Sequence, residues 1–272
     1  MSIPVVAAEI SDYSIVEPVL EIVPRPKLSL IIPAYNEQSR LGQSLAEAWE
    51  YLSSQPYDFE LIVCDDGSTD STRQIAEAFA GAHGRVRAVS IPHAGKAVAI
   101  RSGMKAARGE IVAFTDADLA TPLCYLEPFL AALDAGADVV IGSREGSEAN
   151  RVGEPEYRHV MGRIFNRMVQ WLVLPGINDT QCGFKAFSRF ACLEISRRTR
   201  LYADQETITG ARVTAFDVEM LVIARKMRLK IVEIPVVWTY GSQSKVNPIR
   251  DTLTNVRDIA SIKINTLRGS YD

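Results

Sequence analysis

The sequence predicts an α/β protein with a Rossmann-like, mostly parallel sheet flanked by helices. Short apolar runs of strand length alternate with stretches of helical period over residues 28–142, and this alternation is typical of parallel strands joined by right-handed crossovers. Three of the apolar runs end directly in acidic residues, which places those residues where open parallel sheets bind ligands. The 272 residues allow one large domain or two small ones.

The strands expected in the first half are short and apolar, and they lie at 28–32, 61–64, 86–91, 111–115 and 138–142. The helices between them repeat apolar residues at helical spacing. These residues are Leu41, Leu45, Trp49 and Leu52 in the first helix, Ile75, Ala76 and Phe79 in the second, and Leu126, Phe129, Leu130 and Leu133 in the fourth. The third begins at Gly95-Lys96.

The second half of the sequence is less regular. A long helix is expected at about 158–174, a strand at 183–187, a helix at 216–227 and a strand at 231–238. The tail is predicted to be an amphipathic helix, because its apolar residues share one stripe and its charged residues lie off it. The stripe consists of Ile249, Leu253, Val256, Ala260, Ile264 and Leu267.

Composition excludes several classes of protein. A net charge of −3 and a pI near 5.8 argue against nucleic acid as the main partner. The four cysteines form no C-x-x-C pair, so we expect no zinc and a reducing, cytoplasmic compartment. No run reaches the roughly 20 apolar residues of a membrane span, and no signal peptide is recognisable. The chain is expected to be cytoplasmic, with peripheral contact to a membrane left open.

Asp116 and Asp118 follow the predicted strand at 111–115. Side chains at positions i and i+2 of a strand point the same way, so both carboxylates can face one ligand. Mg²⁺ and Mn²⁺ prefer such oxygen ligands and usually share their shell with substrate phosphates. The alternative is a solvated loop pair. The position at the end of a buried strand favours the metal.

Asp65 and Asp66 follow the strand at 61–64 and precede Gly67-Ser68-Thr69-Asp70, which resembles a turn with a helix cap. A cap does not explain two acids directly after a strand, so Asp66 is assigned to a nucleobase or ribose. Lys96 follows Gly95 at a helix start, where backbone N–H groups and a cation suit an anion. A solvated first-turn lysine is the alternative.

Three cationic residues are candidates for binding a phosphate. Arg144 ends a predicted strand, Arg163 lies on the long helix, and Lys185 follows Gly183-Phe184. A guanidinium binds phosphate in bidentate fashion, which makes Arg144 the strongest candidate, although most arginines only decorate surfaces.

Two further sites have both a functional and a structural interpretation. Asp217 begins a helix, where an acid favours the helix dipole, yet it is also the natural candidate for a general base. Ser244-Lys245 would close over a diphosphate or simply open the tail helix. The three histidines show no metal-ligand spacing and are assigned to turns and surfaces.

Taken together, the motifs resemble family 2 glycosyltransferases with a GT-A fold. The matching stretches in the first half are 33–37 (PAYNE), 65–70 (DDGSTD), Gly95-Lys96 and 116–118 (DAD). The second half looks like the dolichyl-phosphate β-glucosyltransferases. The stretches that carry this likeness are 179–185 (DTQCGFK), 216–219 (FDVE) and Trp238 with 244–246 (SKV).

The resemblance implies a metal-dependent, inverting transfer of a hexose, glucose from UDP-glucose in the first instance, to a polyprenyl or dolichyl phosphate. Mg²⁺ or Mn²⁺ would be held by Asp116 and Asp118. The residues expected to bind the nucleotide sugar are Pro33, Ala34, Tyr35, Glu37, Asp65, Asp66, Lys96, Asp116 and Ala117. Catalytic roles fall to Asp118, Arg144 and Asp217, and acceptor phosphate binding to Arg144, Arg163, Lys185, Ser244 and Lys245.

Residues 1–26 lack clear periodicity and end in Pro24-Arg25-Pro26, so they are expected to form a flexible arm, in which 19–23 could pack as a short strand. The resemblance makes 27–240 a GT-A catalytic domain and 241–272 a helical tail. Within the domain, 27–145 would be the nucleotide-sugar half and 146–240 the acceptor half. Residues 199–214 look like a lengthened acceptor loop.

Departures from the family pattern bear on sugar and acceptor. The related mannosyltransferases carry Gln where this chain has Ala120, which favours glucose. The N-terminal membrane anchor of the eukaryotic glucosyltransferases is missing from this sequence, so a soluble small-molecule or glycan acceptor stays open. The tail helix is expected either to lie in a membrane interface or to pack against the domain or a second subunit.

A nucleotidyltransferase and a binding-only sensor are the two alternative functions. A nucleotidyltransferase would also use an α/β sheet with acidic metal ligands, but the sequence has no Gly-rich, basic N-terminal loop for a nucleoside triphosphate. A binding-only sensor of nucleotide sugars is disfavoured because all the acidic positions are filled.

Overall fold

The computed structural model describes residues 24–203, 214–241 and 248–272. Residues 1–23 of the arm expected at 1–26, the central part of the expected acceptor loop and the pair Ser244-Lys245 lie outside these residues. Among the helices described, none is long and apolar enough to cross a membrane. The domain limits expected from the sequence stay predictions.

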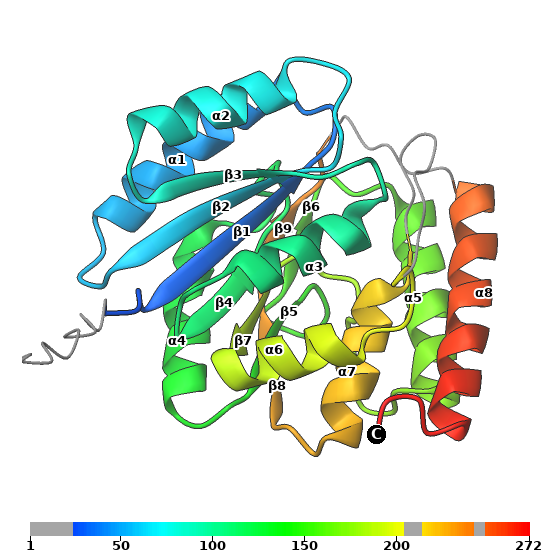
Figure 1. Ribbon diagram of the computed structural model, residues 1–272. Coiled ribbons are helices and arrows are strands. Elements are labelled where there is room, and N and C mark those ends of the chain that lie inside the picture. The colour runs from blue at the N-terminus through cyan, green and yellow to red at the C-terminus, as the bar shows by residue number, and fades with distance from the viewer. Residues whose placement is uncertain (1–23, 204–213, 242–247) are drawn as a thin grey trace, which may run out of the picture.

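A seven-stranded sheet in the order β3-β2-β1-β4-β7-β5-β8 forms the centre of the molecule (Figure 1). All neighbouring pairs are parallel except those that β7 makes with β4 and β5. The strands are β1 (Leu28–Ala34), β2 (Phe59–Asp65), β3 (Val86–Ser90), β4 (Ile111–Phe114), β5 (Val139–Ser143), β7 (Lys185–Ser188) and β8 (Ile231–Pro235). This confirms the predicted α/β fold with a mostly parallel sheet.

Helices cover both faces of the sheet because successive strand residues point to opposite sides. Leu30 and Ile32 pack with one set of helices, whereas Ile31 packs with the other. The first set is α1 (Leu41–Ser53), α2 (Thr72–Ala82) and α4 (Leu126–Asp134), which follows the short 3₁₀ helix η1 (Leu123–Tyr125). The second set is α3 (Lys96–Ala106), α6 (Arg189–Arg198) and α7 (Phe216–Lys226).

The second half differs from expectation in three places. The strand expected at 231–238 is divided, so that β8 joins the main sheet while β9 (Val237–Thr239) pairs with β6 (Asn150–Val152) in a separate two-stranded sheet. Neither β6 nor α6 was predicted. β7 is antiparallel to its neighbours, an orientation that the local sequence pattern does not specify.

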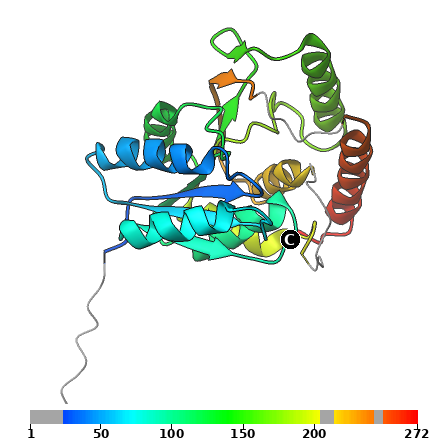
Figure 2. The same ribbon diagram turned by 90° about the horizontal axis from the view of Figure 1, so that it is seen from above.

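Two long helices, α5 (Glu156–Leu172) and α8 (Pro248–Leu267), lie side by side (Figures 1 and 2). Both views place them beyond the end of the sheet toward which β1 points. The predicted apolar stripe of α8 is not the face that packs inward. Asn255, Asp258, Ile259 and Ile262 are buried, whereas Leu253, Val256, Ile264 and Leu267 are exposed.

Candidate active site

Acidic residues from three adjacent strands meet at one edge of the sheet. β2, β1 and β4 are neighbours and run in the same direction, so the segments that follow them lie together. These segments carry Asp66 after β2, Glu37 after β1 and the pair Asp116 and Asp118 after β4. The strand order agrees with the predicted convergence of these segments, and their role in binding a ligand stays a prediction.

Asp116 and Asp118 present partly open carboxylates there. Their side chains are 34% and 32% exposed. Asp116 forms an ion pair with Lys96 at the start of α3, and Asp118 Oδ2 lies 3.7 Å from Arg40 Nη1. Leu119, in the left-handed region at a φ of 49°, closes the turn after them, where its N–H donates to the carbonyl of Asp116.

The donor set fits a hard divalent cation that shares its shell with a substrate. Both side chains offer only oxygen, the ligand atom that Mg²⁺ and Mn²⁺ prefer. Burial and the neighbouring Asp116 carboxylate raise the pKa of Asp118. A cation between the two carboxylates would relieve their repulsion. The described part of the chain holds no group of three or more acidic, histidine or cysteine side chains suited to a metal. Phosphate and water oxygens would have to complete the shell.

Lys96 is charged at this edge. Burial alone would lower its pKa, but the carboxylates of Asp116 and Asp217 outweigh it and the net shift is upward. The structure thus brings Lys96 to the predicted metal ligands.

Asp66 is buried and fixes the loop before α3. Its carboxylate accepts hydrogen bonds from the backbone N–H groups of Ala94 and Gly95 and contacts His93 Nδ1 at 2.8 Å. The His93 ring stacks on Tyr35 at 3.8 Å between centroids. Sequence reasoning assigned His93 to a turn, because its partner Tyr35 is far away in the chain.

The other residues predicted to bind nucleotide are built into the same edge. Asp65 is buried and accepts a hydrogen bond from the Ser68 N–H. Pro33 and Ala34 end β1, and the Glu37 N–H donates to Thr72 Oγ1. Ala117 is buried and its carbonyl accepts from Ser44.

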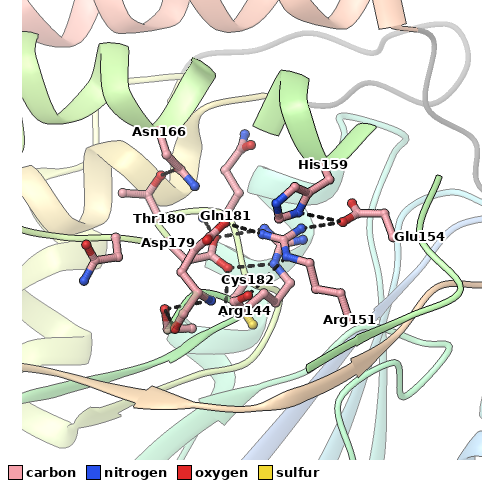
Figure 3. Close-up of polar contacts among 12 residues, drawn as sticks. Arg144, Arg151, Glu154, His159, Asn166, Asp179, Thr180, Gln181 and Cys182 are labelled. Atoms are coloured by element: carbon pink, nitrogen blue, oxygen red, sulfur yellow. Dashed lines mark hydrogen bonds and ion pairs between the residues drawn. The ribbon is translucent and has the colours of Figure 1, made fainter. Parts of the chain in front are cut away.

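In the second half, Arg144 is held by Asp179 (Figure 3). Its Nε lies 2.7 Å from Asp179 Oδ2 and its second terminal nitrogen 2.9 Å from Oδ1, while the guanidinium stands over the Trp238 ring. Asp179 is fully buried. Burial would raise its pKa, but the Arg144 guanidinium holds that pKa well below its usual range. The pair is therefore charged on both sides.

Arg144 lines a pocket of about 730 Å³. Arg163, also predicted, lies in the same lining, together with Arg151 and His159, which sequence reasoning missed. Arg151 bridges Glu145 and Glu154 at 2.8 and 2.7 Å, as Figure 3 shows for Glu154. The other lining residues are Glu145, Gly146, Ala149, Glu154, Glu156 and Val160.

Lys185 does not line this pocket. Its side chain is 0% exposed, and its Nζ donates to Asp217 Oδ1 at 2.7 Å and to the Cys182 carbonyl. Lys185 therefore contacts Asp217 and not the pocket in which an acceptor phosphate was expected. Burial raises the pKa of Asp217 even though Lys185 and Lys96 oppose that shift. Ser244 and Lys245 lie outside the described residues.

The segment 179–183 joins the two parts of the site. Asp179 at one end holds Arg144. At the other end, Gly183 lies so close to Asp116 that a Cβ there would be 2.1 Å from Oδ2. The short segment 179–183 therefore links the metal-type carboxylates to the arginine-containing pocket.

A mostly parallel sheet, with paired carboxylates at one edge and an arginine-containing pocket on the second half, is the arrangement of a glycosyltransferase of the GT-A type. The chain belongs to the glycosyl transferase family 2, whose family model matches residues 29–195, more than half of its length.

Relatives cover most of the chain. The chain is 33% identical to a human dolichyl-phosphate beta-glucosyltransferase over 269 residues, which span 91% of this chain and 78% of the relative. The Drosophila melanogaster enzyme of the same name is 34% identical, with 93% and 79% covered. A crystal structure of glucosyl-3-phosphoglycerate synthase from Mycobacterium tuberculosis, with Mn²⁺, UDP and glucosyl-3-phosphoglycerate, superposes with a TM-score of 0.59. At 21% identity, and with 89% and 79% of the two chains covered, it shows the shared fold.

Proposed function

We propose that the protein transfers glucose from UDP-glucose to dolichyl phosphate or a related polyprenyl phosphate, with inversion at the sugar carbon and with Mg²⁺ or Mn²⁺ at Asp116 and Asp118. The names of the similar human and Drosophila proteins support this sugar and acceptor. The single observation that carries the proposal is the segment 179–183, which abuts Asp116 and holds Arg144. It supports a donor diphosphate and an acceptor phosphate meeting in one cleft.

The residues have distinct roles in this proposal. A bound divalent cation would supply positive charge to the departing diphosphate. Lys96, paired with Asp116, adds a second positive charge there. Arg144, locked by Asp179 and Trp238, would orient the acceptor phosphate without losing much conformational freedom.

The acceptor needs little activation. An oxygen of the acceptor phosphate, already anionic at neutral pH, would form the new bond to the sugar carbon as the bond to the diphosphate breaks. No proton has to leave the nucleophile. Asp217 is then better placed as an orienting charge held by Lys185 than as an obligatory base.

The protein would work at a membrane surface, because its acceptor is a lipid. A soluble phosphorylated acceptor is the second candidate, since most of the residues that line the pocket are charged and its volume suits a small molecule.

The test is transfer by the purified full chain. It would be incubated with Mg²⁺ or Mn²⁺, UDP- and GDP-hexoses, and a short polyprenyl phosphate in detergent, and labelled sugar measured in the organic phase. Transfer from UDP-glucose that stops with a chelator is the expected result. UDP release without a lipid product would reject the lipid acceptor and favour the soluble one.

Asp118→Asn is the matching variant. We expect at least a 100-fold loss of transfer, because the change removes a negative charge from the proposed cation site. Asp134→Asn is the control, since Asp134 carries its charge in an exposed pair with Lys27, and it should leave transfer unchanged. Full activity in Asp118→Asn would remove the metal assignment.

A further inference from the structure

Helix α5 carries an exposed apolar stripe. Val160, Ile164 and Trp171 are exposed at 55%, 64% and 85%. Their spacing of four and seven residues puts them on one side of the helix, over a length of about 16 Å at 1.5 Å per residue. Single exposed apolar side chains are ordinary, but several on one side of a helix mark a surface with a partner.

Helix α8 carries a second stripe of the same kind. Leu253, Ile264 and Leu267 are exposed, Leu267 at 77%. The face that packs inward carries Asp258, whose carboxylate accepts hydrogen bonds from Tyr202 and from the Ala215 N–H. The orientation of α8 is thus set by internal contacts, and these contacts turn its apolar stripe outward.

The two stripes belong to neighbouring helices near the cleft. Lys263 Nζ on α8 donates to the carbonyl of Leu172 on α5 at 2.8 Å, and Figures 1 and 2 show the helices side by side beyond the strand ends. Val160 belongs to the α5 stripe and also lines the pocket of Arg144. The apolar surface therefore continues into the proposed acceptor site.

Basic residues flank both stripes. On α5, Arg167 is exposed between Ile164 and Trp171, and Arg163, which pairs with Glu145, is exposed beside the stripe. On α8, Arg257 and Arg268 are exposed near the stripe. An apolar stripe between exposed basic residues is the pattern of a helix that lies in the interface of an anionic bilayer. The molecule as a whole has a net charge of −3, so these residues would orient it by drawing this side toward the lipid.

We propose that α5 and α8 together form a lipid-docking surface, defined by Val160, Ile164, Trp171, Leu253, Ile264 and Leu267, that rests on an anionic bilayer and opens the pocket of Arg144 toward it. The inference rests on the proposed function for its purpose, since docking would bring the pocket to a lipid-linked phosphate. The docking itself is measurable without any substrate.

The test is sedimentation of the full chain with phosphatidylglycerol–phosphatidylcholine vesicles, in the absence of nucleotide sugar. We expect binding that weakens with salt and falls at least tenfold in Trp171→Glu and in Leu267→Glu. Phe190→Glu on α6 is the matched control, because Phe190 is 60% exposed but lies on a different helix, and it should bind like the unchanged protein. Thermal melts would establish that all three variants fold.

Each outcome bears on the surface separately from the reaction. Absence of vesicle binding by the unchanged protein, or equal binding by all variants, would overturn the docking surface. A dimer that Trp171→Glu dissociates, with no vesicle binding, would assign the surface to a second copy of the chain instead. Transfer to short polyprenyl phosphate in detergent should survive in Trp171→Glu. If vesicles bind but no lipid acceptor is glycosylated, the proposed function fails while the docking surface stands.

Discussion

At the scale of single residues, one buried carboxylate sets the position of Arg144. Asp179 meets the guanidinium with both oxygens and also accepts from the Arg144 backbone N–H at 2.9 Å. Removing one partner of a buried ion pair leaves the other charge uncompensated, which costs more than the pair itself contributes. Asp179, which the sequence motif contained but to which no separate role was assigned, is therefore a positioning residue.

Asp179→Asn should lower the free energy of unfolding by about 3 kcal/mol, because Arg144 loses its charged partner. The KM for the acceptor should rise about tenfold, while the KM for the nucleotide sugar stays unchanged. Urea unfolding and steady-state kinetics measure the two effects. Glu77→Gln, which breaks the exposed pair with Arg73, is the control and should cost at most about 0.5 kcal/mol. Equal effects of the two variants would contradict the role given to Asp179.

At the scale of elements, the segment before β7 is shaped by a close approach of backbone to side chain. A Cβ at position 183 would lie 2.1 Å from Asp116 Oδ2, a distance that forces something to move. Gly183 thus lets the acceptor-side segment pass directly beside the predicted metal ligand.

Gly183→Ala should displace the Asp116 carboxylate and lower transfer at least 100-fold. The apparent affinity for Mn²⁺, measured by titration of activity or by calorimetry with UDP, should fall with it. Gly81→Ala is the comparison, because a Cβ at position 81 meets nothing within 4 Å. That variant sits in α2 and should stabilise the protein by about 0.4–1 kcal/mol. An active Gly183→Ala enzyme with normal Mn²⁺ affinity would show that Asp116 does not need this approach.

The helices and strands also show how much of the fold the local sequence predicts. The alternating pattern predicted β1 to β5 and placed Asp116 and Asp118 at the ligand edge, because strand direction and the two-residue repeat are local properties. The antiparallel β7 and the pairing of β6 with β9 depend on distant partners, as do the contacts of His93 with Asp66 and Tyr35. The burial of Lys185 also depends on distant partners, because it arises only when β7 inserts between β4 and β5. The local sequence does not contain this information and therefore predicted Lys185 at an acceptor phosphate.

At the scale of the whole molecule, Glu219 ties separate regions together. It is fully buried on α7 and accepts hydrogen bonds from the Arg200 and Leu201 N–H groups and from the Tyr271 hydroxyl at 2.8 Å. Burial raises the pKa of Glu219, although these hydrogen bonds oppose the shift. The folded state therefore holds its proton at a higher pH than the unfolded state does.

The sign of the pH effect follows from linkage. Between the ordinary pKa of glutamate and the raised pKa of the folded state, the folded protein binds more protons, so its stability falls as pH rises. Glu219→Gln should remove this part of the pH dependence. Urea unfolding at several pH values from 4 to 8 should give a flatter curve for the variant. A curve parallel to that of the unchanged protein would show that Glu219 does not titrate in this range. Glu77→Gln again serves as the control.

The insertion of β7 also fixes the order in which the sheet can be completed during synthesis. β4 and β5 are not paired with each other, because β7 lies between them, and their other neighbours in the sheet are β1 and β8. Until residue 188 has left the ribosome, the free edge of β4 exposes unpaired backbone groups, and β5 has no strand to join. The two halves of the catalytic region therefore cannot mature one after the other, and a nascent chain that pauses between them would be open to aggregation and dependent on chaperones.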